Sequence, residues 1–395
     1  MNKLICIVIV STLILSSCKK TVQIENKRLE FSNTDEVKML NGNPLVIDID
    51  ESITISSQEL ISKVAKIRYV PLDSKELIGD IRKMVVTEKG IYIMDSFMSQ
   101  AIFVFDKQGK LKFCIDEKGM GPNEYISIWD MQVDEVRNEI MINDALGLSY
   151  KYYSSIDGSF IRKEKGIQNC YVAKVNDLYF NMLGFGQAFN KNEDWQLVVT
   201  DKDSVLYKGF KLEPIQKNDY MNNNISYTYE NEMLYTPVYS DTIYKLNKDL
   251  SFTQWAVIKQ EKSVWNECSK KMNDDEICKI IKENDYTRFS GEVFDTKDYI
   301  SFAVNVGYKA GIIGVWYFFN KKNKDLIRWD MTKTTSKDEI HDCFSTPIAV
   351  FGNEFYSLIS LGKDDKLPNL SPELSAVLPS NREDSNPIVA IYSFE

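Results

Sequence analysis

Residues 84–115, MVVTEKGIYIMDSFMSQAIFVFDKQGKLKFCI, decide the fold. They contain four short runs of β-branched and aromatic residues, separated by Lys89-Gly90, by a polar break after Asp95, and by residues 106–109. Such runs, bounded by Gly, Asp and Asn, predict antiparallel strands joined by tight turns. A small sheet of this kind needs neighbouring sheets to cover its faces, so the stretch predicts one blade of a repeating β structure.

Five looser copies of this unit follow along the chain. They span residues 131–162, 171–210, 229–258 and 293–329, and a last unit from Pro347 to the C-terminus. Six units in about 350 residues give blades of roughly 40 to 60 residues, the range expected for four strands with variable loops. The sequence therefore predicts an all-β fold, a six-bladed β-propeller with four-stranded antiparallel blades.

Two strands at opposite ends of this region predict how the ring closes. Residues 66–72 (KIRYVPL) form a strand pattern without a hairpin partner, and residues 387–394 (PIVAIYSF) form another. We expect them to pair in the final blade, because a ring completed from both ends of the chain leaves no open edge.

Two segments with helical patterns interrupt the strands. Ser56-Ser57-Gln58-Glu59 has the residues of a capping box and predicts a short N-terminal helix through Val64. Residues 263–284 carry apolar side chains at helical spacings. They predict a helical insertion between the fourth and fifth blades, with residues 274–276 facing solvent.

The first twenty residues predict a secreted, lipid-anchored protein. Lys3 precedes an apolar run, residues 4–14, which is too short for a membrane-spanning helix and typical of a signal peptide. Leu15-Ser16-Ser17-Cys18 follows and resembles the lipobox of bacterial lipoproteins, in which the cysteine is acylated. We therefore expect a signal peptide over residues 1–17 and a lipid on Cys18. The alternative is an ordinary secretory signal in which the cysteine is incidental.

The rest of the chain divides into a polar tether over residues 18–43 and the propeller over residues 44–395. The net charge is −9, and loss of Lys3 with the signal leaves −10. This charge argues against nucleic acid or an anionic lipid surface as a partner, although it could also serve only to keep the protein soluble. Lys19-Lys20 after the cysteine is not an acidic export signal, so we expect the periplasmic face of the outer membrane.

Several of these stretches together resemble a known family. The chain is similar to the bacterial lipoproteins described as six-bladed β-propellers, which are related to NHL-type and TolB-like propellers. The matching stretches are residues 67–72, 90–109, 119–125 and 386–389, and the similarity covers nearly the whole mature chain, weakly in the third and fifth blades. The resemblance implies a fold and a cell-envelope location, since the family has no agreed enzymatic activity.

The most distinctive loop has the pattern G-x-G-P-x-E-Y, formed by Gly119, Gly121, Pro122, Glu124 and Tyr125. Phosphate-binding loops also use glycines, but here the proline removes one amide and a strand follows instead of a helix. We expect a structural crossing between the first and second blades. In it the glycines would have positive φ and the tyrosine would pack between the sheets.

Three aspartates follow the second strands of their blades: Asp95, Asp144 and Asp241. They could ring one mouth of the central channel as ligands of a sugar or a metal, with Trp129 and Arg82 beside them. A metal held by carboxylates alone would be a hard cation such as calcium. The alternative is that each aspartate caps a turn by accepting backbone N–H bonds.

The single histidine, His341, excludes a multi-histidine metal site, and the cysteines are scattered without a CxxC pair. We therefore predict no cofactor. Our first hypothesis is a non-enzymatic binding or scaffold module for a glycan, a peptide or an envelope protein, with the ligand over the central channel. The alternative is a carboxylate-based hydrolase or lyase, calcium-dependent or not, at the propeller mouth. Clustered carboxylates would favour the enzyme and a broad aromatic surface would favour binding.

Overall fold

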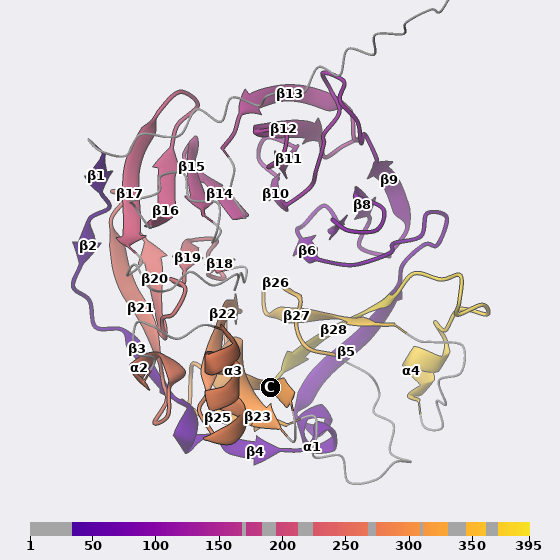
Figure 1. The fold of residues 1–395 in the computed structure, drawn as a ribbon. Helices are drawn as coiled ribbons and strands as arrows, with labels where there is room; N and C mark the ends of the chain where they lie inside the picture. Colours follow the sequence, from indigo (N-terminus) through magenta and orange to yellow (C-terminus); the bar gives the residue numbers. More distant parts are fainter. Residues whose placement is uncertain are drawn as a thin grey trace, which may run out of the picture.

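The structure is a computed structural model that describes residues 34–167, 171–183, 195–211, 224–267, 274–308, 311–330, 345–360 and 370–395. Within these residues, six β-sheets stand around a central axis (Figure 1). Each contains four strands joined mainly by antiparallel pairing, and three of the sheets gain additional parallel strands at their outer edges. The predicted all-β, six-bladed propeller is confirmed.

The strands of blades one to three, in order from the axis outward, are these: β6 (Lys83–Val86), β7 (Ile91–Asp95), β8 (Ala101–Phe105) and β9 (Leu111–Ile115); β10 (Asp130–Asp134), β11 (Glu139–Asp144), β12 (Ser149–Ser154) and β13 (Phe160–Lys165); β14 (Tyr171–Val175), β15 (Leu178–Met182), β16 (Trp195–Thr200) and β17 (Val205–Lys211). Those of blades four to six are β18 (Ile225–Tyr227), β19 (Met233–Tyr235), β20 (Thr242–Leu246) and β21 (Phe252–Lys259); β22 (Arg288–Asp295), β23 (Tyr299–Tyr308), β24 (Gly311–Asn320) and β25 (Leu326–Trp329); β26 (Ala349–Phe351), β27 (Glu354–Ile359), β28 (Ile388–Phe394) and β5 (Val64–Pro71).

The ring closes as predicted, through pairing of the two ends of the propeller. The innermost strands β6, β10, β14, β18, β22 and β26 contact one another in this order, and β26 contacts β6. In blade six, β5 pairs antiparallel with β28, with Arg68 opposite Ile391. The N–H of Leu72 extends this pairing by donating to the carbonyl of Pro387 at 3.2 Å.

The N-terminal residues wrap around the outside of the ring, a feature absent from the sequence prediction. β1 (Asp35–Glu36), β2 (Met39–Leu40), β3 (Leu45–Asp48) and β4 (Ile53–Ile55), with the 3-10 turn η1 (Ile49–Glu51), follow one another along the edges of blades three to five (Figure 1). They pair in parallel with β17, β21 and β25. We call residues 35–55 the belt.

The belt corrects the predicted boundary of the tether at residue 43. Residues 35–40 belong to the propeller, because their backbone N–H and C=O groups pair with outer strands. Such pairing uses the main chain and needs no apolar side chains, so the polar composition gave no signal of it. Residues 18–33, with Cys18, lie outside the described residues.

The N-terminal helix is confirmed, with its predicted cap. α1 (Ser57–Ser62) follows Ser56, whose hydroxyl accepts the N–H of Glu59 at 3.3 Å while the Glu59 carboxylate accepts the N–H of Ser56 at 2.8 Å. The helix stops short of Val64 because that residue already belongs to β5. A further helix, α4 (Pro372–Ser375), contacts β5.

The predicted helical insertion between blades four and five appears as two helices. They are α2 (Val264–Glu267) and α3 (Asp274–Glu283), and residues 268–273 between them lie outside the described residues. α3 contacts β23 and β24, and its Ile277 and Ile281 are buried with Val264. Asp275 and Glu276 are exposed, as predicted.

One interface between blades differs from the other five. Between most neighbouring blades the described residues form an apolar cluster of eleven or more buried side chains. The cluster between blades two and three contains only five, Met141, Tyr150, Tyr152, Val172 and Tyr179. Three of these are tyrosines, whose buried hydroxyls need hydrogen-bond partners. This interface is therefore the polar seam of the ring.

Candidate functional site

One face of the propeller carries the turns between second and third strands together with the connections from one blade to the next. These segments meet there because antiparallel strands place them at the same end of the sheet. In blades one and two they are residues 72–82, 96–100, 116–129 and 145–148. We call these four segments the loop face.

Asp95 ties two segments of the loop face together. Its fully buried carboxylate accepts backbone N–H bonds from Gly79 at 3.0 Å, Asp80 at 3.1 Å and Met98 at 2.9 Å, and the Ser99 hydroxyl at 2.8 Å. Burial alone would raise the pKa of Asp95, but the hydrogen bonds from these donors lower it to about 2. The contacts are those of the capping alternative.

Asp144 repeats the arrangement in blade two. Its buried carboxylate accepts N–H bonds from Ile126 at 3.2 Å, Ser127 at 3.0 Å and Gly147 at 3.0 Å. The first two donors precede β10 and the third lies in the turn before β12. Asp144 therefore fixes the connection between blades in the way that Asp95 does.

Asp241 has a different environment, although its place in the repeat is similar. Its carboxylate accepts side-chain hydrogen bonds from Gln260 at 2.6 Å and from the Ser263 hydroxyl, at the start of α2. Burial raises the pKa of Asp241 to about 6, and the bonds from Ser263 and Gln260 offset only part of the rise. The predicted equivalence of the three aspartates therefore holds for two of them.

The G-x-G-P-x-E-Y loop is a structural crossing, but the reason for glycine at positions 119 and 121 differs from the one predicted. Neither Gly119 nor Gly121 has a positive φ. They are required because the Glu124 carboxylate folds back over them. A Cβ on Gly119 would lie 1.9 Å from Glu124 Oε2, which also accepts the Gly121 N–H at 2.7 Å. The loop closes on its own acidic residue and leaves no cradle for an anion.

Tyr125 packs between blades one and two, as predicted. It is fully buried, its hydroxyl donates to the Gln100 carbonyl at 2.7 Å, and its ring meets Tyr153 edge-on at 6.4 Å between centroids. Pro122, earlier in the loop, accepts a hydrogen bond from Lys151 through its carbonyl at 3.3 Å.

The loop face also exposes an unusual number of large apolar side chains. Of the fifteen such side chains exposed on the described residues, seven lie there: Leu77, Phe97, Met98, Met120, Ile126, Trp129 and Leu146. Phe97 is 63% and Met98 74% exposed. Arg82 stacks on the Phe97 ring at 4.1 Å and pairs with Asp80 at 2.8 Å. Arg82 and Trp129 directly precede the inner strands β6 and β10, and their role as ligand contacts stays a prediction.

The central channel contains polar side chains from four blades. Lys83 pairs with Asp130 at 2.6 Å, and Gln132 donates to the Tyr227 hydroxyl of blade four at 2.9 Å. Burial raises the pKa of Glu292, on β22, to about 7, and the charge of Lys83 lowers it in part. The sequence prediction named none of these residues, since no local pattern distinguishes the inner strands' polar positions.

On the face opposite the loop face, a pocket of about 580 Å³ lies at the polar seam between blades two and three. Its walls come from the turns β10–β11, β14–β15 and β16–β17, from the adjoining ends of β11, β14 and β15, and from β13. Four basic, four acidic and two uncharged residues line it: Arg137, Arg162, Lys174 and Lys202; Glu139, Glu164, Asp177 and Asp201; and Asn176 and Leu178.

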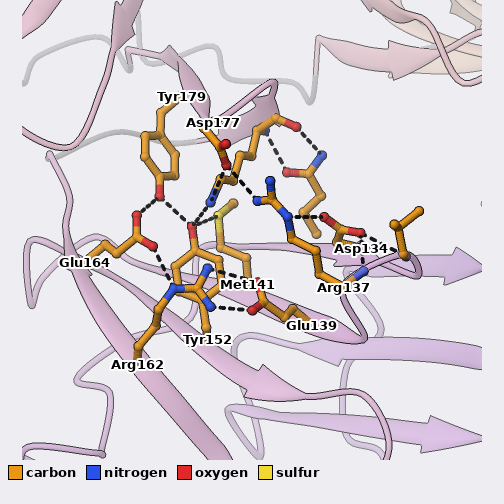
Figure 2. A network of polar contacts seen from close by, with 12 residues as sticks. Asp134, Arg137, Glu139, Met141, Tyr152, Arg162, Glu164, Asp177 and Tyr179 are labelled. Atoms are coloured by element: carbon orange, nitrogen blue, oxygen red, sulfur yellow. Dashed lines mark hydrogen bonds and ion pairs between the residues drawn. The ribbon is translucent and has the colours of Figure 1, made fainter.

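A network of charged groups and tyrosines holds this pocket in shape (Figure 2). Arg162 binds Glu139, at 2.9 Å in one of two contacts, and Glu164 at 2.8 Å, while its guanidinium lies 3.7 Å above the Tyr152 ring. The hydroxyls of Tyr152 and Tyr179 are 2.5 Å apart, and Tyr179 also bonds to Glu164. The pocket floor is therefore fixed by paired groups before any ligand arrives.

The rim of the pocket is formed by a second group of contacts. Arg137 donates to Asp177 at 2.7 Å, and Lys174 lies 3.7 Å from the same carboxylate and 3.0 Å from the Tyr152 hydroxyl. Asn176 and Asp177 both have positive φ in the tight β14–β15 turn. Asn and Asp tolerate this conformation, and that dipeptide between two strand patterns was the only local sequence signal of the rim.

The lowered pKa of Glu164 does not suit this residue to acid catalysis. Burial would raise the pKa of Glu164, but the hydrogen bonds from Tyr179 and Arg162 lower it below its usual range. A glycosidase needs one carboxyl group with a raised pKa to protonate the leaving group. Glu164 is ionised at neutral pH and is suited to accepting hydrogen bonds.

No three His, Cys, Asp or Glu side chains of the described residues gather as they would around a metal ion. None of their helices is both long and apolar enough to cross a bilayer. His341 lies outside the described residues.

A comparison with family models finds one that spans the propeller. The model described as "Domain of unknown function (DUF4934)" matches residues 44–393, from the belt to β28. No curated protein matches the chain. The predicted resemblance to NHL-type and TolB-like propellers stays an expectation.

Solved structures with the same architecture include two from Bacteroides. A candidate exported protein from Bacteroides fragilis NCTC 9343 is similar with a TM-score of 0.66 and 17% identity, over 89% of this chain and 99% of that one. A DUF4221 family member from Bacteroides vulgatus ATCC 8482 has a TM-score of 0.52 and 13% identity, over 84% and 97% of the two chains. At these identities the likeness concerns the fold alone.

Proposed function

The chain belongs to the DUF4934 family, whose description assigns no activity, and we propose from its surface that it is a non-enzymatic module that binds a protein partner in the cell envelope. The observation that carries the proposal is that seven large apolar side chains are exposed on the four segments of the loop face, all on one side of blades one and two. Large contiguous apolar surfaces are rare on monomeric proteins and mark sites of interaction.

The composition of the loop face supports a protein as the partner. Phe97, Met98 and Trp129 belong to the residue types enriched at the centres of protein interfaces, and so does Arg82. Methionine adapts its shape to a partner surface, and the stacked arginine can donate hydrogen bonds at its edge. Asp95 and Asp144 hold the segments that present these side chains, so binding would require little reorganisation of the backbone.

The cell envelope is proposed from the N-terminus and one comparison. The predicted signal peptide and the lipobox-like residues ending at Cys18 support a lipid-anchored, exported protein, on the periplasmic face of the outer membrane. The similar structure from Bacteroides fragilis is itself described as a candidate exported protein. Calcium forms no part of the proposal.

Site-specific photo-cross-linking in cells tests this function. A photoreactive amino acid replaces Met98 on the loop face or, as a matched control, Ile156, which is 66% exposed in the β12–β13 turn on the opposite face. We expect a discrete covalent adduct with another protein from position 98 only. Equal adducts from both positions, or no adduct at position 98, would contradict the proposal.

A further inference from the structure

We propose that the pocket between blades two and three is a second binding site, which takes a neutral oligosaccharide. The pocket lies on the face opposite the loop face, so this inference is independent of the proposed protein partner. It stands on the polarity of the seam, the charge balance of the pocket and its fixed geometry.

The polarity of the seam sets this interface apart from the rest of the core. The other blade interfaces are filled with apolar side chains, which stabilise a fold without the desolvation penalty of buried ions. Here Tyr152 and Tyr179 are fully buried with their hydroxyls bonded to each other, and Arg162 and Lys174 lie against their rings. Packing alone does not require this choice of residues.

The charge balance of the pocket selects the ligand class. Four basic and four acidic side chains line it, so an anionic ligand would meet four carboxylates and a cationic ligand four positive groups. A neutral ligand avoids both penalties. Donors and acceptors lie side by side at the rim, as at Arg137 and Asp177, and a sugar hydroxyl both donates and accepts.

The size and rigidity of the pocket fit the same class. Its volume of about 580 Å³ lies within the range of roughly 300 to 1,000 Å³ common for small-molecule sites. Leu178 supplies an apolar wall for the C–H groups of a sugar ring. The network that holds Arg162 and Glu164 in place reduces the entropy that a ligand must overcome on binding.

Calorimetric titration of the full chain tests the site. The probes are linear hexasaccharides of glucose, mannose, xylose and galactose, with hexagalacturonate as the anionic counterpart. We expect at least one neutral sugar to bind with a stoichiometry of one, and the anionic sugar to bind at least tenfold more weakly. The Arg137→Ala variant should weaken binding of the neutral sugar at least tenfold, since it removes donors at the rim and leaves Asp177 with Lys174 alone as its cationic partner.

The matched control is Arg68→Ala. Arg68 is 49% exposed and pairs with Glu354 at 2.8 Å, much as Arg137 is 44% exposed and pairs with Asp177 at 2.7 Å, but it lies in blade six. The affinity of the Arg68→Ala variant for the neutral sugar should stay within twofold of that of the unmodified protein. Should Arg137→Ala fold poorly, Lys202→Glu, at a 76% exposed side chain, should still weaken binding severalfold.

Three results would overturn the proposal: no neutral sugar binds, the anionic sugar binds better, or Arg137→Ala and Lys202→Glu bind as the unmodified protein does. If Trp129→Ala lost sugar binding and the pocket variants did not, the sugar would bind at the loop face and the pocket proposal would be wrong. Cross-linking at Met98 is scored separately, so failure of either proposal is seen without the other.

Discussion

At the scale of single residues, the protein shows that one residue type at similar places in a repeat can have opposite environments. Asp95 is surrounded by backbone N–H groups that favour its ionised form, whereas Asp241 accepts bonds from two neutral side chains that do not offset its burial. The sequence predicted the cap at Asp95 as an alternative, because an Asp before a turn is a local signal. It could not predict the partners of Asp241, since Gln260 and Ser263 come from beyond the next two strands.

The lowered pKa of Asp95 predicts acid sensitivity. Its folded-state pKa is about 2 and its usual value is 3.8, so its ionisation stabilises the fold above pH 4 and that contribution is lost as the pH falls from 4 to 2. Asp95→Asn should therefore lower the free energy of unfolding at pH 7 by about 2 kcal/mol, and the difference should shrink below pH 4. Urea denaturation from pH 2 to pH 7 measures it.

Asp241→Asn is the control, because Asp241 contributes to the pH dependence of the free energy of unfolding with the opposite sign. The pKa of Asp241 is raised to about 6, so the unmodified protein loses stability as the pH rises from 4 to 6 and this variant should not. If the free energies of unfolding of Asp95→Asn and the unmodified protein differed by the same amount from pH 2 to pH 7, the proposed capping role of ionised Asp95 would be contradicted.

At the scale of elements, strands with alternating patterns were predictable and strands made only by the backbone were not. β5 and β28 pair as expected because both have long runs of β-branched and aromatic residues. β1 and β2 have two residues each and polar neighbours, so their pairing with β17 and β21 leaves no trace in the local sequence.

Two truncations separate these kinds of strand. Removal of residues 387–395 should abolish cooperative thermal unfolding, because β28 lies between β27 and β5 and the ring opens without it. Removal of residues 34–43 should leave a cooperative transition at a lower temperature, since it only uncovers the edges of β17 and part of β21. Circular dichroism during heating distinguishes them, and a cooperative transition after the first truncation would refute the closure of the ring.

At the scale of the whole molecule, the sequence repeat predicted the ring of blades. The pocket and the loop face were not predictable in this way, because both depend on how neighbouring blades meet. A period in the sequence reports strand number and order, which decided six blades. The pocket joins Arg137 to Asp177, forty positions apart on different blades, and no motif links them. Of the exposed side chains on the loop face, only Trp129 and Arg82 were predicted as ligand contacts, because exposure of its other apolar residues depends on which loops converge.

The measurement that tests the central claim most directly is the yield of the cross-link from the loop face after its apolar residues are replaced. The photoreactive amino acid is placed at Met120, which is 81% exposed. Phe97, on the segment 96–100, and Trp129, at the far end of the segment that carries Met120, are changed to serine. These side chains are exposed, so the melting temperature should change by no more than a few degrees. If the loop face binds a protein, the yield of the adduct should fall at least tenfold relative to the chain that retains both aromatic residues. An undiminished yield with both residues replaced would contradict the proposal that this apolar surface is the binding site.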